Sequence, residues 1–376
     1  MSEAPVRMWL AAPMDGEVAD AIDRLRRAVD VTQVAVMPDV HLAADVCVGV
    51  AVATSRLLYP QAVGGDIGCG MLAVSFDRDA AVLRDPKIAG QVLSGLRTAV
   101  PARRHNRGAT AAQPEEICGV PLSDGGLEAM RRADGVLEFA TLGSGNHFLE
   151  LQADEEGRLW LMVHSGSRAL GQAIHRHHLA RGQSLAGGLR ALDADSSDGV
   201  AYLRDSAIAR RYADASRRAM AERAGDLLSK VLGARLDWDT AIATDHNHVT
   251  RERLGEGELW IHRKGAMPAG CGVRGVLPGS MGTLSFHVEG RGNEAALCSS
   301  AHGAGRALSR SAARAKVSEG ELHRQMEGVW FDFRLAGALR EEAPAAYKDI
   351  RAVLRAQSEL VKVTRTLRPV LNYKGA

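Results

Sequence analysis

Five short segments, spread over most of the chain, each place a metal-binding or nucleophilic side chain among glycines or other small residues. They are GGDIGCGM with Asp66 and Cys69, LGSGNHFLE with Asn146 and His147, VHSGSR with His164, DHNHV with His246, and SSAHGAGR with His302. Glycine lacks a Cβ and adopts positive φ without strain, so a reactive side chain beside it can lie on a tight turn facing a cavity. A histidine that only fills a core needs no such neighbours. The pattern predicts a fold whose glycine-rich turns present reactive side chains.

Helical and strand-like stretches alternate along the chain. Helical periodicity covers residues 16–29 and 199–235, and strand-like apolar runs end at Pro38 and cover residues 46–54. Residues 137–164 predict two strands joined by the acidic turn ADEEG, further short strands continue to residue 289, and a helix is expected from about 304 to 318. We find no Pro/Ser linker, low-complexity tract or repeat. The pattern predicts an α/β (α+β) fold in one intertwined domain over residues 1–376, with a mainly helical segment near 168–235.

Composition argues against several classes of protein. No apolar run approaches the roughly 20 residues of a membrane-spanning helix, and the first residues lack the basic and apolar parts of a secretory signal. The chain has five cysteines, an odd number, and no CxxC pair, which argues against a disulfide framework. We therefore expect the protein to be located in the reducing cytoplasm. The net charge of +2 favours no partner, but only seven of the 47 basic residues are lysine. Arginine suits phosphate recognition, although a GC-rich genome explains the same excess more simply.

The side chains in these segments fit a transition metal. Asp66 and Cys69 lie three residues apart in one loop, close enough to hold one ion or two neighbouring ions, and a thiolate can bridge two. One carboxylate, one thiolate and several imidazoles favour Zn²⁺ or Mn²⁺ over Ca²⁺ or Mg²⁺. Each histidine alone is more simply explained as a hydrogen-bonded or surface residue, and only the five clusters together favour a metal site. His248 competes with His246 for the role of ligand.

Two glycine-rich segments have the composition of an anion-binding loop. LPGSMGTLSF, residues 277–286, offers backbone N–H groups and hydroxyls in a turn. HGAGR, residues 302–306, is expected at the start of a helix, where N–H groups and the dipole favour phosphate. The sequence has no Walker A loop and no well-placed GxGxxG. The usual signatures of P-loop kinases and of dinucleotide-binding dehydrogenases are therefore absent.

Other histidines carry less information. His175, His177 and His178 lie in an arginine-bearing helical run and are expected on a solvated face. His262 precedes Arg263 and Lys264 in a strand-like segment, which gives weak support for a phosphate-facing role.

Together, these segments resemble the RtcB-type RNA ligases of tRNA splicing and RNA repair. The matching stretches follow the order typical of that family. They are VMPDVH (36–41), AVGGDIGCGM (62–71), LGSGNHFLE (142–150), VHSGSR (163–168), HN (246–247), RKGA (263–266), PGSMG (278–282), HGAGR (302–306) and NYKG (372–375). After PDVH the family commonly continues with a glycine-rich stretch, whereas this chain reads HLAADVCVG and gains Asp45. The chain is also shorter than many relatives, so the RNA it prefers stays open.

The resemblance implies a single RtcB-like domain with central β-sheets surrounded by helices. It implies two divalent metal ions per active site, usually Mn²⁺, bridged by Cys69, with the other ligands being Asp66, His147, His164 and His246. It also implies that His302 attacks the α-phosphate of GTP and forms histidine-bound GMP. The residues around the nucleotide would be Asn146 and Arg306 at the phosphates and Glu150, Ser280, Ser285 and Lys374 at the guanine and ribose.

The implied function is a GTP- and Mn²⁺-dependent RNA ligase that joins 2′,3′-cyclic phosphate or 3′-phosphate ends to 5′-hydroxyl ends. Its partners would be broken tRNA or rRNA ends, GTP and an activating or repair protein, with no membrane involved. The alternative is a metal-dependent RNA-end phosphoesterase that no longer ligates. A non-catalytic RNA-binding relative ranks lower, because Asp66, Cys69 and His302 are all present.

Overall fold

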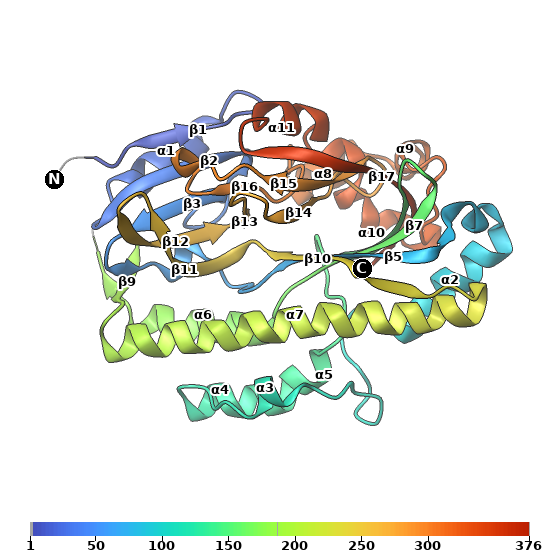
Figure 1. Ribbon diagram of the computed structural model, residues 1–376, viewed down its shortest axis with the longest axis horizontal. Coiled ribbons are helices and arrows are strands. Elements are labelled where there is room, and N and C mark those ends of the chain that lie inside the picture. Colours follow the sequence, from blue (N-terminus) through green and yellow to red (C-terminus); the bar gives the residue numbers. More distant parts are fainter. Residues whose placement is uncertain (1–2, 186, 376) are drawn as a thin grey trace.

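Two large β-sheets form the centre of the molecule in the computed structural model, which describes residues 3–185 and 187–375 (Figure 1). The five-stranded sheet contains, in spatial order, β1 (Val6–Met8), β2 (Val31–His41), β3 (Val48–Thr54), β12 (Gly257–Lys264) and β11 (Asn247–Leu254). The seven-stranded sheet contains β10 (Leu236–Asp245), β5 (Gly70–Asp79), β7 (Arg158–Ser165), β6 (Phe148–Ala153), β17 (Val361–Lys374), β15 (Ser285–Gly290) and β14 (Arg274–Leu277). Two small sheets pair β13 (Ala266–Pro268) with β16 (Ser299–Ala301), and β9 (Arg190–Asp193) with both β4 (Leu57–Leu58) and β8 (Gln183–Ser184).

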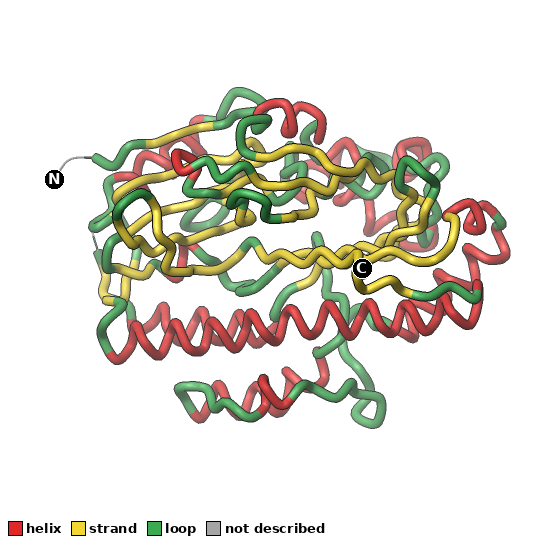
Figure 2. The backbone as a smooth tube through the Cα atoms, viewed as in Figure 1, coloured by secondary structure: helices red, strands yellow, loops and turns green. Residues whose placement is uncertain are grey.

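The longest helix, α7 (Ser197–Leu232), runs along one face of these sheets (Figures 1 and 2). Ser196 begins it by accepting a hydrogen bond from the Gly199 N–H, and Gly233 ends it with a φ of 65°. The remaining helices are α1 (Gly16–Arg26), α2 (Pro86–Ala99), α3 (Glu115–Cys118), α4 (Gly125–Met130), α5 (Val136–Glu138), α6 (Arg168–Arg181), α8 (Arg310–Lys316), α9 (Glu319–Gln325), α10 (Ala336–Leu339) and α11 (Ile350–Ala356). Across residues 3–185 and 187–375, none of the helices combines the length and the apolar character needed to cross a membrane.

The central strands are apolar on both faces because both faces are covered. On β5, Leu72 and Val74 belong to the core that α7 closes, whereas Met71 and Ala73 pack against residues of β7, β10 and β14. The sequences of strands that are buried on both faces are continuous apolar runs, without alternation of apolar and polar residues.

The mixed α/β fold expected from the sequence is confirmed, and the expected helix at 199–235 is α7. The segment near 168–235 consists of α6 and α7 with the short strands β8 and β9 between them.

The helix expected from 304 to 318 is wrong at its start, because α8 begins only at Arg310. Gly305 has a φ of +72°, outside the helical range, and Arg306 forms an isolated β-bridge with Tyr347. HGAGR is therefore a loop, and the expected contribution of a helix dipole to anion binding there is withdrawn.

Candidate active site

The register of the seven-stranded sheet brings four segments of the chain to one end of the sheet. Cys69 directly precedes β5, and Gly70 at the start of β5 pairs with both Ser165 at the end of β7 and Asp245 at the end of β10. Phe148, which follows His147, pairs with His164. The chain then passes from β10 to β11, and thus between the two large sheets, at His246. Residues 66–69, 147, 164 and 246 are distant in sequence but meet here.

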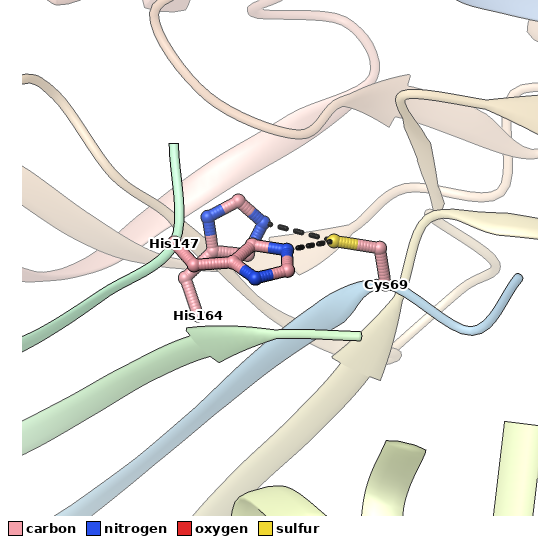
Figure 3. A group of neighbouring side chains, drawn as sticks. All are labelled: Cys69, His147 and His164. Atoms are coloured by element: carbon pink, nitrogen blue, oxygen red, sulfur yellow. Dashed lines mark hydrogen bonds between the residues drawn. The ribbon is translucent and has the colours of Figure 1, made fainter. Parts of the chain in front are cut away.

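Three of these side chains form a compact group suited to a metal ion. Cys69 Sγ lies 3.5 Å from Nε2 of His147 and 3.3 Å from Nε2 of His164, and the three atoms lie within 4.8 Å of one another. Figure 3 shows both imidazole rings turned toward the sulfur atom. A thiolate and two imidazole nitrogens are ligands that borderline divalent metals accept.

Backbone carbonyls orient the two imidazole rings. Nδ1 of His147 lies 3.0 Å from the Leu142 carbonyl oxygen, and Nδ1 of His164 lies 3.0 Å from that of Asn146. A proton on each Nδ1 satisfies these carbonyls and leaves each Nε2 with a free lone pair. Metal-binding histidines are commonly held in this way.

Asp66 extends the group on the side of His147. Its Oδ2 lies 2.9 Å from His147 Nε2, and its Oδ1 is buried with no hydrogen-bond partner among the described residues. Asn247 fixes this loop by donating from Nδ2 to the Asp66 carbonyl and by accepting the Gly265 N–H. A buried carboxylate oxygen without a donor fits a site that takes a cation.

The electrostatics of the group point the same way. Burial, followed by the charge of Asp66, raises the pKa of the Cys69 thiol well above its ordinary value. Burial lowers the pKa of His164 and of His246, so both imidazoles stay neutral, which is the form that binds metals. The thiol must lose its proton on binding, which a divalent cation can bring about.

His302 lines the same pocket, next to His246. Its ring centroid is 4.5 Å from that of His246, which in turn is 5.3 Å from that of His164. His302 Nδ1 lies 2.6 Å from Oδ2 of Asp39, and the same oxygen accepts the His302 backbone N–H at 3.1 Å. With Nδ1 facing the carboxylate, Nε2 is the nitrogen left for reaction.

Sequence reasoning missed Asp39. This residue is fully buried in the segment VMPDVH, where it follows Pro38 with no glycine on either side. It contacts His302, 263 positions later, and such long-range pairing has no local signal. The only available hint was that VMPDVH belongs to the motifs shared with the family.

All but one of the predicted site residues line a single pocket. These residues are Asp66, Cys69, Asn146, Glu150, His164, His246, Ser280, Ser285, His302, Arg306 and Lys374. The exception, His147, lies beside the pocket in contact with Cys69 and Asp66. The pocket also takes in Lys264, Arg310, Glu342 and Tyr347, which were not predicted as site residues.

Glu150 is a buried residue of this pocket with polar partners. Its two oxygens accept hydrogen bonds from Gln152 Nε2 at 2.7 Å and from Asn372 Nδ2 at 2.6 Å. Burial raises the pKa of Glu150 to about 8, although these two donors and the charge of Lys374 oppose the rise. A carboxyl group that can change its protonation state at neutral pH lies here.

Arg306 and Lys374 meet at one buried carboxylate. Glu342 Oε1 lies 3.0 Å from Arg306 Nη1, and Oε2 lies 2.8 Å from Lys374 Nζ. Arg306 also donates to the carbonyls of Leu308 and Glu341 and reaches the Tyr347 hydroxyl. Most of its donors are therefore engaged within the protein, which leaves little of the guanidinium for a phosphate.

The remaining predicted residues line the pocket from loops and from the start of β15. Ser280 and Thr283 join their hydroxyls at 3.0 Å, and Ser285 Oγ accepts the Gly279 N–H at 3.3 Å. Asn146 has an exposed side chain in the pocket, and its carbonyl holds His164. The 277–286 segment is thus a folded turn between β14 and β15 that presents hydroxyls to the pocket.

The structure changes the interpretation of several other histidines. His248 lies outside the pocket, where its Nδ1 is 2.9 Å from Asp245 Oδ1, so His246 is the one beside His164 and His302. His262 is fully buried and accepts the Tyr59 N–H, which excludes a phosphate-facing role.

The solvated face expected for the histidines of α6 is wrong for His178. This residue is fully buried, with Nε2 2.8 Å from Asp205 on α7. His175 and His177 are each half-buried. The error arises because α6 packs against α7, a contact that the sequence of α6 alone does not reveal.

Comparisons with known proteins cover nearly the whole chain. The sequence profile of the family described as "tRNA-splicing ligase RtcB" matches residues 24–127 and 125–375. The chain is 34% identical to the RNA-splicing ligase RtcB of Escherichia coli strain K12, over 99% of this chain and 98% of that protein. It is 29% identical to the tRNA-splicing ligase RtcB of Methanococcus maripaludis, over 84% of this chain and 82% of that protein. The matched ranges contain every pocket residue described above.

Proposed function

Because the chain belongs to the RtcB family, we propose that it is a GTP- and Mn²⁺-dependent RNA ligase. The family expected from the sequence motifs is thereby confirmed. The proposed reaction joins RNA ends that carry a 2′,3′-cyclic phosphate or a 3′-phosphate to ends that carry a 5′-hydroxyl. One observation carries the proposal: His302, paired with Asp39, lies beside His246 in the pocket that Cys69 and His164 also line.

The proposed metal ligands are the residues gathered at the end of the seven-stranded sheet. They are Asp66, Cys69, His147, His164 and His246. Two divalent cations held by these residues would offset the negative charge that builds up on phosphoryl oxygens. The sulfur of Cys69 is central to the group, in contact with two of the imidazoles, which suits a bridging thiolate.

In the first step, Nε2 of His302 attacks the α-phosphorus of GTP. The N–P bond forms as the bond from the α-phosphorus to the bridging oxygen breaks, and pyrophosphate leaves with that electron pair. The imidazole ring gains positive charge in this step, and the buried carboxylate of Asp39 at Nδ1 stabilises it. Asp39 also keeps the Nδ1 proton in place, so that Nε2 enters the reaction as a neutral nucleophile.

The nucleotide is proposed to lie with its base toward Glu150 and Lys374. Ser280 and Ser285 supply hydroxyls along the same wall, where the guanine and ribose would be read. Asn146 and Arg306 are the proposed phosphate contacts. Asn146 lines the pocket, and Arg306, which pairs with Glu342, contributes its positive charge.

Later steps use the same pocket. Water opens the cyclic phosphate to a 3′-phosphate, and the 2′-oxygen leaves as the 2′-hydroxyl. An oxygen of the 3′-phosphate then attacks the phosphorus of the bound GMP as the N–P bond to His302 breaks. The 5′-hydroxyl of the second RNA end finally attacks the 3′-phosphate, and GMP is the leaving group. The proposed substrates are broken tRNA or rRNA ends, with an activating or repair protein as a further partner. We also propose that residues 1–376 act as one domain, since the pocket draws on segments from His41 to Lys374.

The first step is tested by incubating the Mn²⁺-loaded protein with GTP labelled at the α-phosphate. We expect an acid-labile covalent GMP adduct that is lost in His302→Ala. His323→Ala serves as the matched control, because His323 is exposed on α9 and lies outside the pocket. An adduct that persists in His302→Ala, or a wild-type protein that forms none, would refute the proposed nucleophile.

The alternative function is a metal-dependent phosphoesterase without ligation, for which the thiolate–imidazole group alone would suffice. It predicts that the protein opens a cyclic phosphate without GTP, and that Glu150→Ala or Lys374→Ala leaves the rate of this opening unchanged. The presence of both residues in the pocket with His302 favours the ligase.

A further inference from the structure

Lys348 lies between the two segments that carry Asp39 and His302. It precedes α11, and its Nζ donates hydrogen bonds to the carbonyl oxygens of Pro38 at 3.1 Å and Val40 at 2.7 Å. These carbonyls belong to the residues on either side of Asp39. The ammonium group thus holds the backbone of β2 at the position where Asp39 turns toward His302.

The main chain of Lys348 holds the other segment. Its backbone N–H donates to the carbonyl oxygen of Gly305 at 2.9 Å, three residues after His302. Gly305 packs tightly on the other segment, since a Cβ at this position would lie only 2.4 Å from the Asp39 carbonyl oxygen. One residue therefore clamps both sides of the contact between Asp39 and His302.

Charge adds to this geometry. Asp39 is fully buried, and its Oδ1 has no hydrogen-bond partner among the described residues. Lys348 in turn lies within 4.0 Å of no carboxylate in the part of the chain that the structure describes. A buried carboxylate is costly without a nearby positive charge, and the ammonium group of Lys348, bound to the carbonyls of both neighbours of Asp39, supplies one.

We propose that Lys348 is a positioning residue for the nucleophile, which holds Asp39 and the loop after His302 together so that the carboxylate stays aligned with Nδ1. This inference rests on the proposed function of His302. Lys348 touches neither nucleotide nor metal in this account and acts only through Asp39.

The first test compares Lys348→Met with Arg351→Met in the assay for the GMP adduct. Arg351 is an exposed neighbour on α11 and provides a matched loss of one positive charge. We expect Lys348→Met to lower the saturating rate about 10–100-fold, the usual effect of removing a group that orients a reacting one. The GTP concentration for half-maximal rate should change little, because binding contacts remain. An unchanged rate, or a change in GTP affinity alone, overturns the inference.

The second test is a double-mutant cycle with Asp39→Asn. If Lys348 acts through Asp39, Lys348→Met adds little to the loss already caused by Asp39→Asn, whereas independent roles give additive losses and overturn the inference. Should Lys348→Met fail to fold, Lys348→Arg and Lys348→Gln replace it. The arginine variant keeps the charge and must retain more activity than the glutamine variant.

A third readout does not depend on GTP. In protein loaded with diamagnetic Zn²⁺, because paramagnetic Mn²⁺ would broaden signals this close to the site, the ring ¹H–¹⁵N signal of His302, assigned by its loss in His302→Ala, should report a proton held at Nδ1 by Asp39. We expect this signal to broaden or shift in Lys348→Met and to stay in place in Arg351→Met. A wild-type protein without a GMP adduct would refute the proposed function, while a His302 signal indifferent to Lys348→Met would refute the positioning role by itself.

Discussion

At the scale of single residues, the two arginines that follow His302 differ in what their guanidinium groups can reach. Arg306 is engaged by Glu342, Tyr347 and two backbone carbonyls. Arg310 has a side chain that is 49% exposed and lies 3.7 Å from Glu342. The first guanidinium is built into the wall of the pocket, whereas the second makes longer contacts to Glu341 and Glu342 and can turn toward a ligand.

This difference predicts opposite effects of the two alanine substitutions. Arg306→Ala removes the nearest cation from Oε1 of the buried Glu342, leaving Lys374 at Oε2 and the more distant Arg310, and should lower the free energy of unfolding by about 3 kcal/mol. Arg310→Ala should leave stability nearly unchanged and instead weaken binding of GTP or RNA phosphates. Urea unfolding and GTP titration of both variants check this. Equal losses of stability would contradict the assignment.

Glu150 gives a prediction about pH. Its pKa is raised by burial from the ordinary value of 4.5 to about 8, so the folded protein holds a proton there that the unfolded chain releases. This contribution to stability is fully present below pH 4.5, declines as pH rises to about 8 and is constant above it.

Glu150→Gln should remove this dependence. Relative to wild type, the variant should gain stability between pH 5 and pH 8, by at most about 1.4 kcal/mol per pH unit. Urea unfolding at several pH values measures the difference, with Glu258→Gln as the control, since Glu258 is exposed on β12. A stability difference that stays constant over this range would rule out a proton on Glu150.

At the scale of elements, α7 supports the proposed metal site through one buried side chain. Arg217 Nη1 donates to the carbonyl oxygens of Gly68 at 2.8 Å and Ser165 at 2.9 Å. Gly68 lies between Asp66 and Cys69, and Ser165 follows His164. The guanidinium therefore ties the loop before β5 to the end of β7.

Arg217→Met should loosen this connection without touching a proposed ligand. We expect the affinity for Mn²⁺ to fall about 10–100-fold, as when groups that orient metal ligands are removed. Arg218→Met is the matched control, because the neighbouring Arg218 is exposed and pairs with Glu222 instead. Metal titration of both variants decides the point, and equal affinities would show that α7 does not support the site.

Elements that depend on local sequence could be predicted, and elements that depend on distant contacts could not. The buried strand β3 and the helix α7 follow from an apolar run and from helical periodicity. HGAGR was misassigned because its conformation is set by Asp39 and Tyr347, which lie far from it in the sequence. The same limit explains why the reactive turns were recognised individually, while Asp39 and Lys348 were missed.

At the scale of the whole molecule, the candidate site gathers segments that are distant in the sequence. Its side chains come from the loop before β5, from the starts and ends of neighbouring strands and from the crossing between the two large sheets at His246. Lys374 brings in the C-terminal strand through Glu342. A cation bound here would contact segments separated by up to 180 residues, from Asp66 to His246.

Metal removal should therefore destabilise the entire protein and not only the pocket. A cation that binds only the folded chain adds about 2.7 kcal/mol when its concentration is 100 times its dissociation constant. Because the raised pKa of Cys69 keeps its thiol protonated in the free protein, binding must displace that proton, and the gain should be larger at pH 8 than at pH 6. Thermal unfolding of chelated and Mn²⁺-loaded protein at both pH values measures this gain as a shift in the unfolding temperature.

Cys69→Ala should abolish most of this shift, whereas Cys118→Ala, at an exposed position, should preserve it. A shift that survives in Cys69→Ala would place the stabilising cation elsewhere in the molecule.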